Sequence, residues 1–113
     1  MRIEIRGRNT HVTDALREHV DERFEKVSKQ VADQAQMEVE LMEERNPAIA
    51  NGKIAEATLH LKGTTLRAEE ASADLMHSID LCAEKMARQV KRYSDKRRRR
   101  RDEPGLGRLA QSA

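Results

Sequence analysis

Residues 72–101 have the pattern of one long amphipathic helix, and this stretch most constrains how the chain can fold. Apolar side chains recur in it at intervals of three and four residues, which places them along one side of an α-helix. These side chains are Leu75, Ile79, Cys82, Met86, Val90 and Tyr93. We therefore expect this side of the helix to pack against the protein's own core.

A second stripe on the same helix is basic and lies about a third of a turn from the apolar one. It consists of Lys85, Arg88, Arg92 and Lys96. The acidic residues Asp80, Glu84 and Asp95 gather on a different arc. Solubility alone would be served better by alternating ion pairs along the helix. The segregation, and the run Arg97–Arg101 that follows, indicate a face that binds a polyanion.

The charge of the chain is distributed unevenly along the sequence. The formal net charge is only +2, yet residues 85–101 contain ten Lys or Arg and one acid, Asp95, and the remainder sums to −7. A net-acidic body with a strongly basic end predicts docking to phosphate by one surface. The competing interpretation is a merely solvated tail, and the basic stripe within the folded helix argues against it.

Composition limits the class of protein further. Aromatic residues make up 2% of the 113 residues, so the core must consist of aliphatic side chains and methionine. The one cysteine, Cys82, falls on the apolar stripe and is expected to be a small buried residue in a reducing compartment. Neither a signal peptide nor a membrane-spanning apolar run is apparent, which predicts a cytoplasmic protein without membrane contact.

The remaining elements follow from alternation and helical spacing. A strand is expected at residues 2–6, and a helix capped by Thr13 is expected to run to Val31 or Asp33. Further strands are expected at 36–43, about 55–62 and about 65–70, with the last helix beginning near Ser72 or Ala73.

This order, β-α-β-β-β-α, predicts an α+β fold. Every strand is polar on one side, so both helices should cover one face of a four-stranded sheet and leave the other exposed to solvent. The first two strands should be parallel through a right-handed crossover, and the last three should form an antiparallel meander. Residues 1–101 are expected to form one domain, with 102–113 as a flexible tail or the start of a linker.

Catalytic and metal-binding signals are weak. The histidines His11, His19, His60 and His77 have no carboxylate or thiol at motif spacing, and no glycine-rich phosphate loop is present. We therefore expect no enzyme activity, no metal, no cofactor and no small-molecule substrate. The open sheet face has no aromatic side chain to stack on bases, so a nucleic acid would bind the helices through its backbone and shape.

Several segments resemble the ribosome hibernation-promoting factor family, also called ribosome-associated translation inhibitors. The first helix resembles it at Val12–Val20 and Arg23–Val27, and the third strand at Glu56–Leu61. The last helix is similar at Asp74–Asp80 and Glu84–Tyr93. The resemblance covers about residues 1–100 in order, with the same β-α-β-β-β-α arrangement.

The resemblance implies a ribosome hibernation factor that binds the small (30S) ribosomal subunit and its 16S-type rRNA at the decoding region. There it would block mRNA and tRNA and inhibit translation during stress. By position, Lys85, Arg88 and Arg92 match basic positions of the family, and Lys26 matches on the first helix. The expected rRNA-binding residues are Lys26, Lys85, Arg88, Arg92, Lys96, Arg97, Arg98, Arg99, Arg100 and Arg101.

Two departures from the family pattern, one open question about the chain and two alternative functions accompany this hypothesis. Met76 stands where an aromatic residue is common, and Arg97–Arg101 is longer than in short members. The chain is either a short member or part of a long one, whose C-terminal domain would be needed to pair ribosomes. The other candidate functions are a generic double-stranded RNA-binding module and a structural module that pairs with a protein.

Overall fold

The computed structural model describes the backbone of residues 1–102 and the side chains of residues 1–99. Four strands and three helices occur in this part of the chain. In order they are β1 (Arg2–Arg8), α1 (Asp14–Arg23), α2 (Glu25–Ser28), β2 (Gln36–Glu43), β3 (Lys53–Leu61), β4 (Thr64–Ser72) and α3 (Leu75–Asp102).

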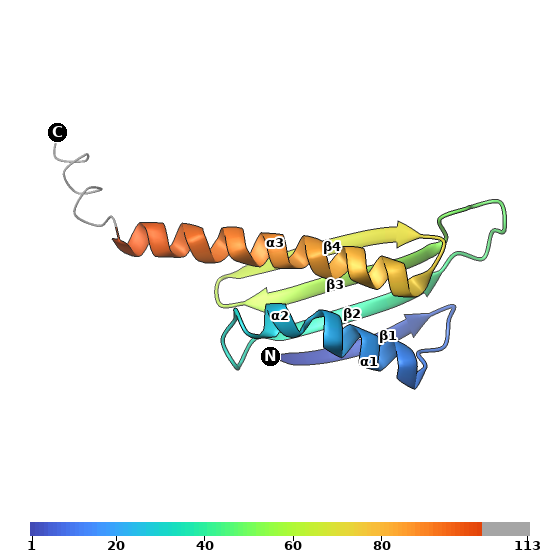
Figure 1. The fold of residues 1–113 in the computed structure, drawn as a ribbon, viewed down its shortest axis with the longest axis horizontal. Helices are drawn as coiled ribbons and strands as arrows, with labels where there is room; N and C mark the ends of the chain where they lie inside the picture. The colour runs from blue at the N-terminus through green and yellow to red at the C-terminus, as the bar shows by residue number, and fades with distance from the viewer. Residues whose placement is uncertain (103–113) are drawn as a thin grey trace.

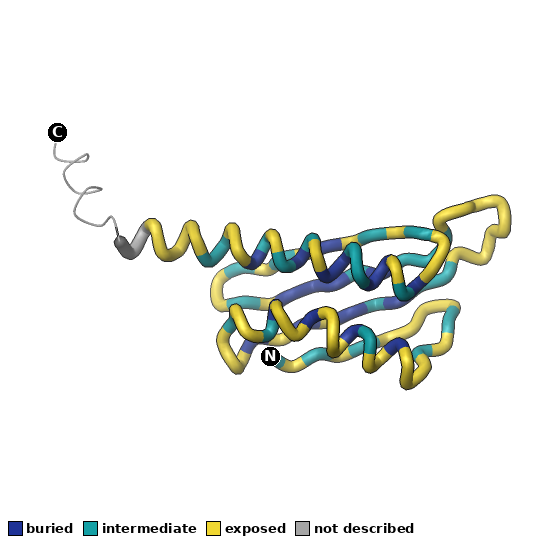
Figure 2. Tube along the Cα trace, in the orientation of Figure 1, coloured by how far each residue is buried: buried dark blue, intermediate teal, exposed yellow. Residues whose placement is uncertain are grey.

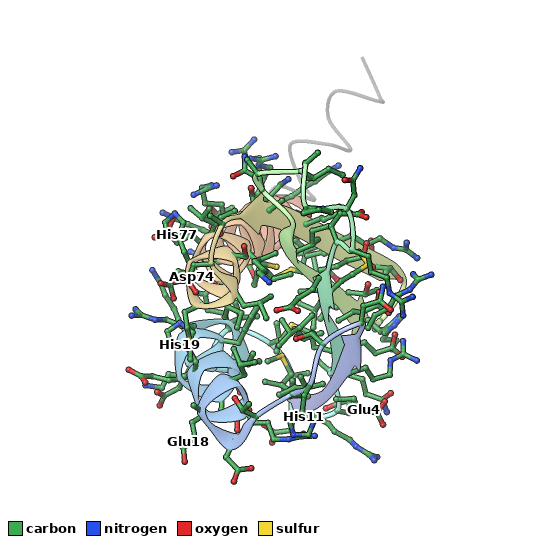
Figure 3. All side chains as sticks on the ribbon, turned by 90° about the vertical axis from the view of Figure 1, so that its right-hand side faces the viewer. Glu4, His11, Glu18, His19, Asp74 and His77 are labelled. Atoms are coloured by element: carbon green, nitrogen blue, oxygen red, sulfur yellow. The ribbon has the colours of Figure 1, made fainter. Side chains whose placement is uncertain are left out.

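The strands form one sheet in the order β1-β2-β3-β4 (Figure 1). β1 is parallel to β2, while β2, β3 and β4 are successively antiparallel. Seen end-on, the helices form one layer and the sheet a second (Figure 3). The predicted α+β fold, with its crossover unit, its meander and both helical segments on one face, is confirmed.

The core lies between these two layers and is built as the alternation and helical spacing predicted. The inward side chains of β2 and the apolar stripes of the helices, from Leu16 to Val27 and from Leu75 to Val90, are all but inaccessible to solvent. The largest fully buried side chains are Phe24, Met37, Leu41, Leu59, Ile79 and Met86. Burial of this kind contributes about 1.5–3 kcal/mol for each large apolar side chain, so it dominates the stability of the fold.

Side-chain oxygens fix the starts of the two main helices. Thr13 Oγ1 accepts a hydrogen bond from Leu16 N at 3.2 Å, as its position as the expected N-cap requires. The last helix begins later than predicted, at Leu75, because β4 continues to Ser72 and Asp74 Oδ1 accepts from Met76 N at 3.2 Å. The carboxylate also lies favourably at the positive end of the helix dipole.

Two other predicted boundaries are wrong. The first strand extends through Gly7 to Arg8, because the absence of a side chain at Gly7 lets Thr10 and Val12 fold back against it. The single helix predicted to run to Val31 or Asp33 is divided at Phe24 into α1 and α2, and α2 ends at Ser28. A tight final turn, with Gln30 N bonded to Val27 O at 3.0 Å, redirects the chain so that β2 can pair with β1.

The face of the sheet opposite the helices carries mixed charge, as predicted. Strand register places Glu40 beside Glu56, and Glu56 beside Glu69. Like charges directly opposite each other on neighbouring strands are destabilising, so this row makes the middle of the face unfavourable for a polyanion. Thr58 differs from the expectation, since its neighbours bury it to 9% exposure although it belongs to this face.

The helix α3 is longer than the sheet that supports it. Its 28 residues span about 42 Å, whereas the nine residues of β4 span about 30 Å. Buried positions alternate with exposed ones as far as Val90, and beyond Tyr93 and Ser94 the described side chains are exposed (Figure 2). The part of α3 from Leu75 to Val90, called here its first half, is therefore a core element. The part from Lys91 on, called its second half, lies at the edge of the sheet and projects beyond it.

Candidate nucleic-acid interface

A groove separates α1 and α2 from α3 on the helical side of the molecule. Its volume is about 440 Å³, and four cations and two carboxylates from both sides line it. The lining residues are Arg23, Lys26, Gln30, Asp80, Ala83, Glu84, Ala87, Arg88 and Lys91. The two alanines leave room between the helices, so cations far apart in sequence lie along one concave surface.

Asp80 ties the two sides of this groove together. Its Oδ1 lies 2.7 Å from His19 Nε2 and 2.9 Å from Arg23 Nε, both on α1. The His19 and Asp80 side chains are only 18% and 33% exposed, so their contact is shielded more than an ordinary surface pair. Arg23 is thus fixed at the edge of the groove.

The predicted basic row of α3 divides between two surfaces. Arg88 lies in the groove, together with the predicted Lys26 from α2. Arg92 and Lys96 lie on the β4 side, where they line a hollow with Leu66, Gln89 and Tyr93. The row is continuous along the helix, and its members face different neighbours.

Lys85 does not fit the expectation that the row is free of acidic neighbours. Its Nζ lies 3.8 Å from Glu70 Oε1. Glu70 belongs to the face of β4 that the helices cover, and the partner side chains are 43% and 33% exposed. Helical spacing along α3 gives no indication of a carboxylate that comes from another element. Part of the Lys85 charge is therefore neutralised within the protein.

Arg23 and Lys91 were not among the predicted binding residues, and the structure places both in the groove. Helical spacing puts His19, Arg23, Lys26 and Lys29 along one flank of the first helix, and this flank was the available signal for Arg23. Lys91 lies one position before Arg92 and therefore lies on a different side of the helix. It belongs to the same surface only because α2 lies beside that side of α3.

The arginine run at the end of α3 is exposed where it is described. Arg98 lies 3.7 Å from Asp95, and Arg97 Nη1 donates a 3.3 Å hydrogen bond to Tyr93 Oη. Arg99 is exposed. Asp102, predicted to begin the tail at 102–113, is instead the last residue of α3. The side chains of Arg100 and Arg101, and residues 103–113 of that predicted tail, lie outside the described residues.

The residues considered for catalysis make contacts that are typical of structural roles. Cys82 is fully buried and donates to Ala68 O at 3.4 Å, and burial raises the pKa of its thiol to about 12. His60 Nε2 lies 4.0 Å from Glu38 on the open sheet face. Within residues 1–102, no three His, Cys, Asp or Glu side chains are arranged to hold a metal ion.

Membrane insertion through a helix finds no support in residues 1–102. No helix described there combines the length and the apolar character needed to cross a bilayer.

Comparison with known proteins identifies the family. Residues 3–98 match the model of the family described as Sigma 54 modulation protein / S30EA ribosomal protein. The ribosome hibernation promotion factor of a Picosynechococcus strain is 36% identical over 97 residues, which are 85% of this chain and 50% of that protein. The Staphylococcus aureus factor of the same name is 37% identical over 107 residues, or 93% of this chain and 54% of that protein.

The chain therefore spans about half the length of the curated relatives that it matches. Among solved structures, the Thermus thermophilus Protein Y N-terminal domain is 30% identical with a TM-score of 0.71, covering 82% of this chain and 99% of that one. A ribosomal subunit interface protein from Coxiella burnetii is 21% identical, also with a TM-score of 0.71, over 84% of this chain and 99% of that one, and shows the shared fold. The resemblance found in the sequence is confirmed, and this chain belongs to the Sigma 54 modulation protein / S30EA ribosomal protein family as a relative of the ribosome hibernation promotion factors.

Proposed function

We propose that this chain acts in ribosome hibernation by binding the small ribosomal subunit at its decoding region, where it blocks mRNA and tRNA. The observation that carries the proposal is the groove in which Arg23 and Lys26 face Arg88 and Lys91. A surface made of cations from separate elements suits the spaced phosphates of folded RNA. The names of the matched relatives, ribosome hibernation promotion factors, support the same partner class.

The mechanism is steric and electrostatic rather than chemical, and requires neither a cofactor nor a metal. Cations of the groove and of the α3 row neutralise rRNA phosphates and release their counterions. Arginine suits this task because its planar guanidinium pairs with two phosphate oxygens at once. The rigid body then occupies space that mRNA and tRNA require.

The binding surface comprises the predicted residues and the two that the groove adds. It consists of Arg23, Lys26, Lys85, Arg88, Lys91, Arg92, Lys96 and the run Arg97–Arg101. The proposed domain of residues 1–101 carries this surface. Pairing of two ribosomes is assigned to no residue of this chain.

The glutamate row on the opposite face gives the complex a direction. Glu40, Glu56 and Glu69 repel phosphate, and the helical side attracts it. The chain therefore binds with its helices toward rRNA and its open sheet turned away.

Co-sedimentation with purified 30S subunits tests the proposal. The variant has Lys85, Arg88 and Arg92 all replaced by Ala. The matched control replaces Arg2, Arg6 and Arg67, three cations of the opposite face, and so loses the same charge. We expect the first variant to lose binding and the control to keep it, with circular dichroism confirming that both are folded. Undiminished binding by the first variant contradicts the assignment.

The salt dependence of binding gives a second measure of the interface. If about six phosphates are neutralised, affinity for 30S falls by about three decades between 50 and 200 mM salt. A generic double-stranded RNA-binding module would bind any A-form duplex as tightly as ribosomes. A protein-pairing module would bind without salt dependence and without residues 97–101.

A further inference from the structure

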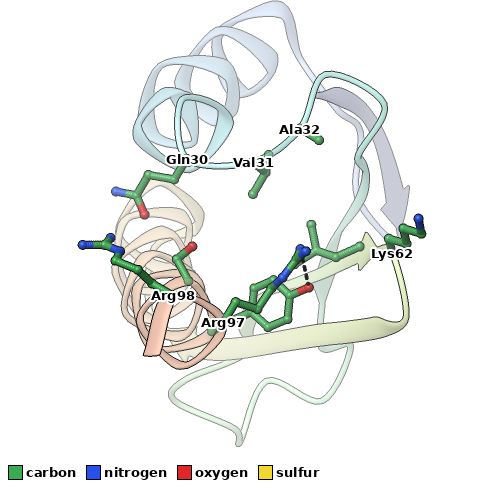
Figure 4. A pocket seen from close by; sticks show the side chains of 9 residues that line it. Gln30, Val31, Ala32, Lys62, Arg97 and Arg98 are labelled. Carbon is green, nitrogen blue, oxygen red and sulfur yellow. Dashed lines mark hydrogen bonds between the residues drawn. The ribbon is translucent and has the colours of Figure 1, made fainter. Parts of the chain in front are cut away.

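Tyr93 is the single tyrosine of the chain, and it occupies an unusual place. Helical spacing puts it on the apolar stripe of α3, yet the structure leaves it only partly buried because it lies where support from the sheet ends. The ring forms a wall of three hollows. The hollow beside Gln30 and Val31 has a volume of about 310 Å³ (Figure 4), and the one beside Gly63 has about 600 Å³.

The surroundings of this ring are cationic. Lys62, Lys96, Arg97 and Arg98 line the two larger hollows, and no Asp or Glu among the described residues lines either of them. The groove between α1, α2 and α3 differs, since Asp80 and Glu84 are part of its lining. Of the four cations near Tyr93, only Arg98 takes part in an ion pair among the described residues, with Asp95 at 3.7 Å.

Arg97 shows what the ring can hold. Its guanidinium carbon lies 5.8 Å from the centre of the Tyr93 ring, and its Nη1 donates to Tyr93 Oη at 3.3 Å (Figure 4). A guanidinium and a nucleobase are both flat groups that stack on aromatic rings. Arg97 is exposed, so it can move from the ring to a phosphate without disturbing the core.

We propose that Tyr93 and its cations form a site for one unpaired nucleotide. The base stacks on the Tyr93 ring in the place that Arg97 now covers, and Lys62, Lys96 and Arg97 bind the flanking phosphate. Both larger hollows fall within or near the range of small-ligand sites, about 300–1,000 Å³. The site rests on the proposed function only in taking RNA as the source of that nucleotide.

The proposed site discriminates between single strands and duplexes. In a duplex the bases are stacked on one another and are not free to lie on a side chain, whereas unpaired nucleotides can be stacked on aromatic rings. The groove and the α3 row read phosphates of folded rRNA, while Tyr93 reads an unpaired base. Sequence tolerance is expected, because every base has an aromatic face.

Intrinsic tyrosine fluorescence tests the site directly, because the chain has one tyrosine and no tryptophan. The probes are hexauridylate, a blunt RNA duplex and inorganic polyphosphate of matched charge, with correction for absorption by the RNA. We expect saturable quenching by hexauridylate and little by the other two. Equal quenching by polyphosphate overturns the proposal, because charge alone then explains the signal.

A further arm uses uridine monophosphate to distinguish the source of the nucleotide. Saturation at the same concentration as hexauridylate identifies a site for free nucleotides. Much weaker saturation by the monomer identifies an RNA strand as the source. Both results retain the stacking chemistry, and absence of quenching by either probe overturns it.

Two variants distinguish the contribution of the Tyr93 ring from that of its hydroxyl group. Tyr93→Leu removes the ring, and we expect binding of labelled hexauridylate, followed by anisotropy, to weaken by about tenfold. Tyr93→Phe keeps the ring and should bind as the unaltered chain does, even if Tyr93→Leu is poorly folded. Binding unchanged in folded Tyr93→Leu, or lost in folded Tyr93→Phe, contradicts the proposal.

Sedimentation with 30S subunits distinguishes a failure of the nucleotide site from a failure of the proposed function. A chain that binds hexauridylate through Tyr93 but does not sediment with 30S subunits disproves the ribosomal role alone. A chain that sediments with 30S but shows no Tyr93-dependent binding of hexauridylate disproves the nucleotide site alone.

Discussion

The two halves of α3 continue one helical pattern but have different surroundings. In the first half, Ile79, Cys82 and Met86 are completely buried against the sheet. In the second half, the apolar stripe ends at the partly exposed Tyr93, and the described side chains after Ser94 are exposed. Periodicity therefore defines which side of a helix can be buried, while the length of the supporting sheet decides how far burial continues.

The largest expected contrast is in stability. Replacing Ile79 by Ala removes fully buried methylenes and leaves a cavity, so we expect a loss of about 2–5 kcal/mol in the free energy of unfolding. Replacing Arg99 by Ala, in the exposed half, should change it by less than about 0.5 kcal/mol. Urea denaturation of both variants measures the difference.

The same two variants test whether the first half of α3 serves stability and the second half serves binding. Arg99→Ala is expected to weaken 30S binding at low salt while it leaves stability unchanged. If both variants lost similar stability, the second half of α3 would have to pack on something, and its description as a projecting arm would be wrong.

A second, smaller contrast concerns the carboxylates of the two halves. Asp80 contacts His19 and Arg23 across the helix interface, so Asp80→Asn should cost about 1 kcal/mol after allowance for its partial exposure. Among the described side chains, Asp95 meets only the exposed Arg98, so Asp95→Asn should cost close to nothing. Thermal and urea unfolding of the matched variants measure both effects.

The outcome depends on the partners rather than on the substitution, which is the same in both variants. Equal losses would contradict the view that Asp80 joins α1 to α3. A larger loss of stability for Asp95→Asn than for Asp80→Asn would mean that the second half of α3, rather than the first, is held in place by its carboxylate.

Local patterns were sufficient for most of the fold. Alternation identified β2 with its observed bounds, and helical spacing identified the apolar stripe from Leu75 to Val90. These patterns work because a strand or helix that covers one core has one buried side. The extension of β1 through Gly7 and the end of the first helical segment at Ser28 depend on tertiary contacts.

The candidate site could be predicted less completely from such patterns. The basic row of α3 is visible from spacing, but the approach of Glu70 to Lys85 comes from a strand 15 positions earlier. Lys91 joins Lys26 and Arg23 only because α3 lies beside α1 and α2. A groove between elements is a property of their packing, and the spacing along one element does not contain it.

The last prediction uses Cys82 as a probe of the buried half. Burial raises the pKa of its thiol from 9.0 to about 12. The folded pKa lies above the unfolded one, so the neutral thiol's contribution to stability is fully present below about pH 9. It is lost as the pH rises from there toward 12, because the unfolded chain then gains by ionising.

Cys82→Ala isolates this effect, since the variant keeps every other titrating group. We expect the difference in unfolding free energy between the two proteins to be constant from pH 6 to about pH 8.5 and to change above that pH, with only the cysteine-containing chain losing the extra stability. Iodoacetamide at pH 8 should label the native thiol far more slowly than the unfolded one, because thiolate is the reactive form. Rapid labelling of the native protein would mean that the first half of α3 opens to solvent, and the contrast between a sealed half and an exposed half would then be one of degree.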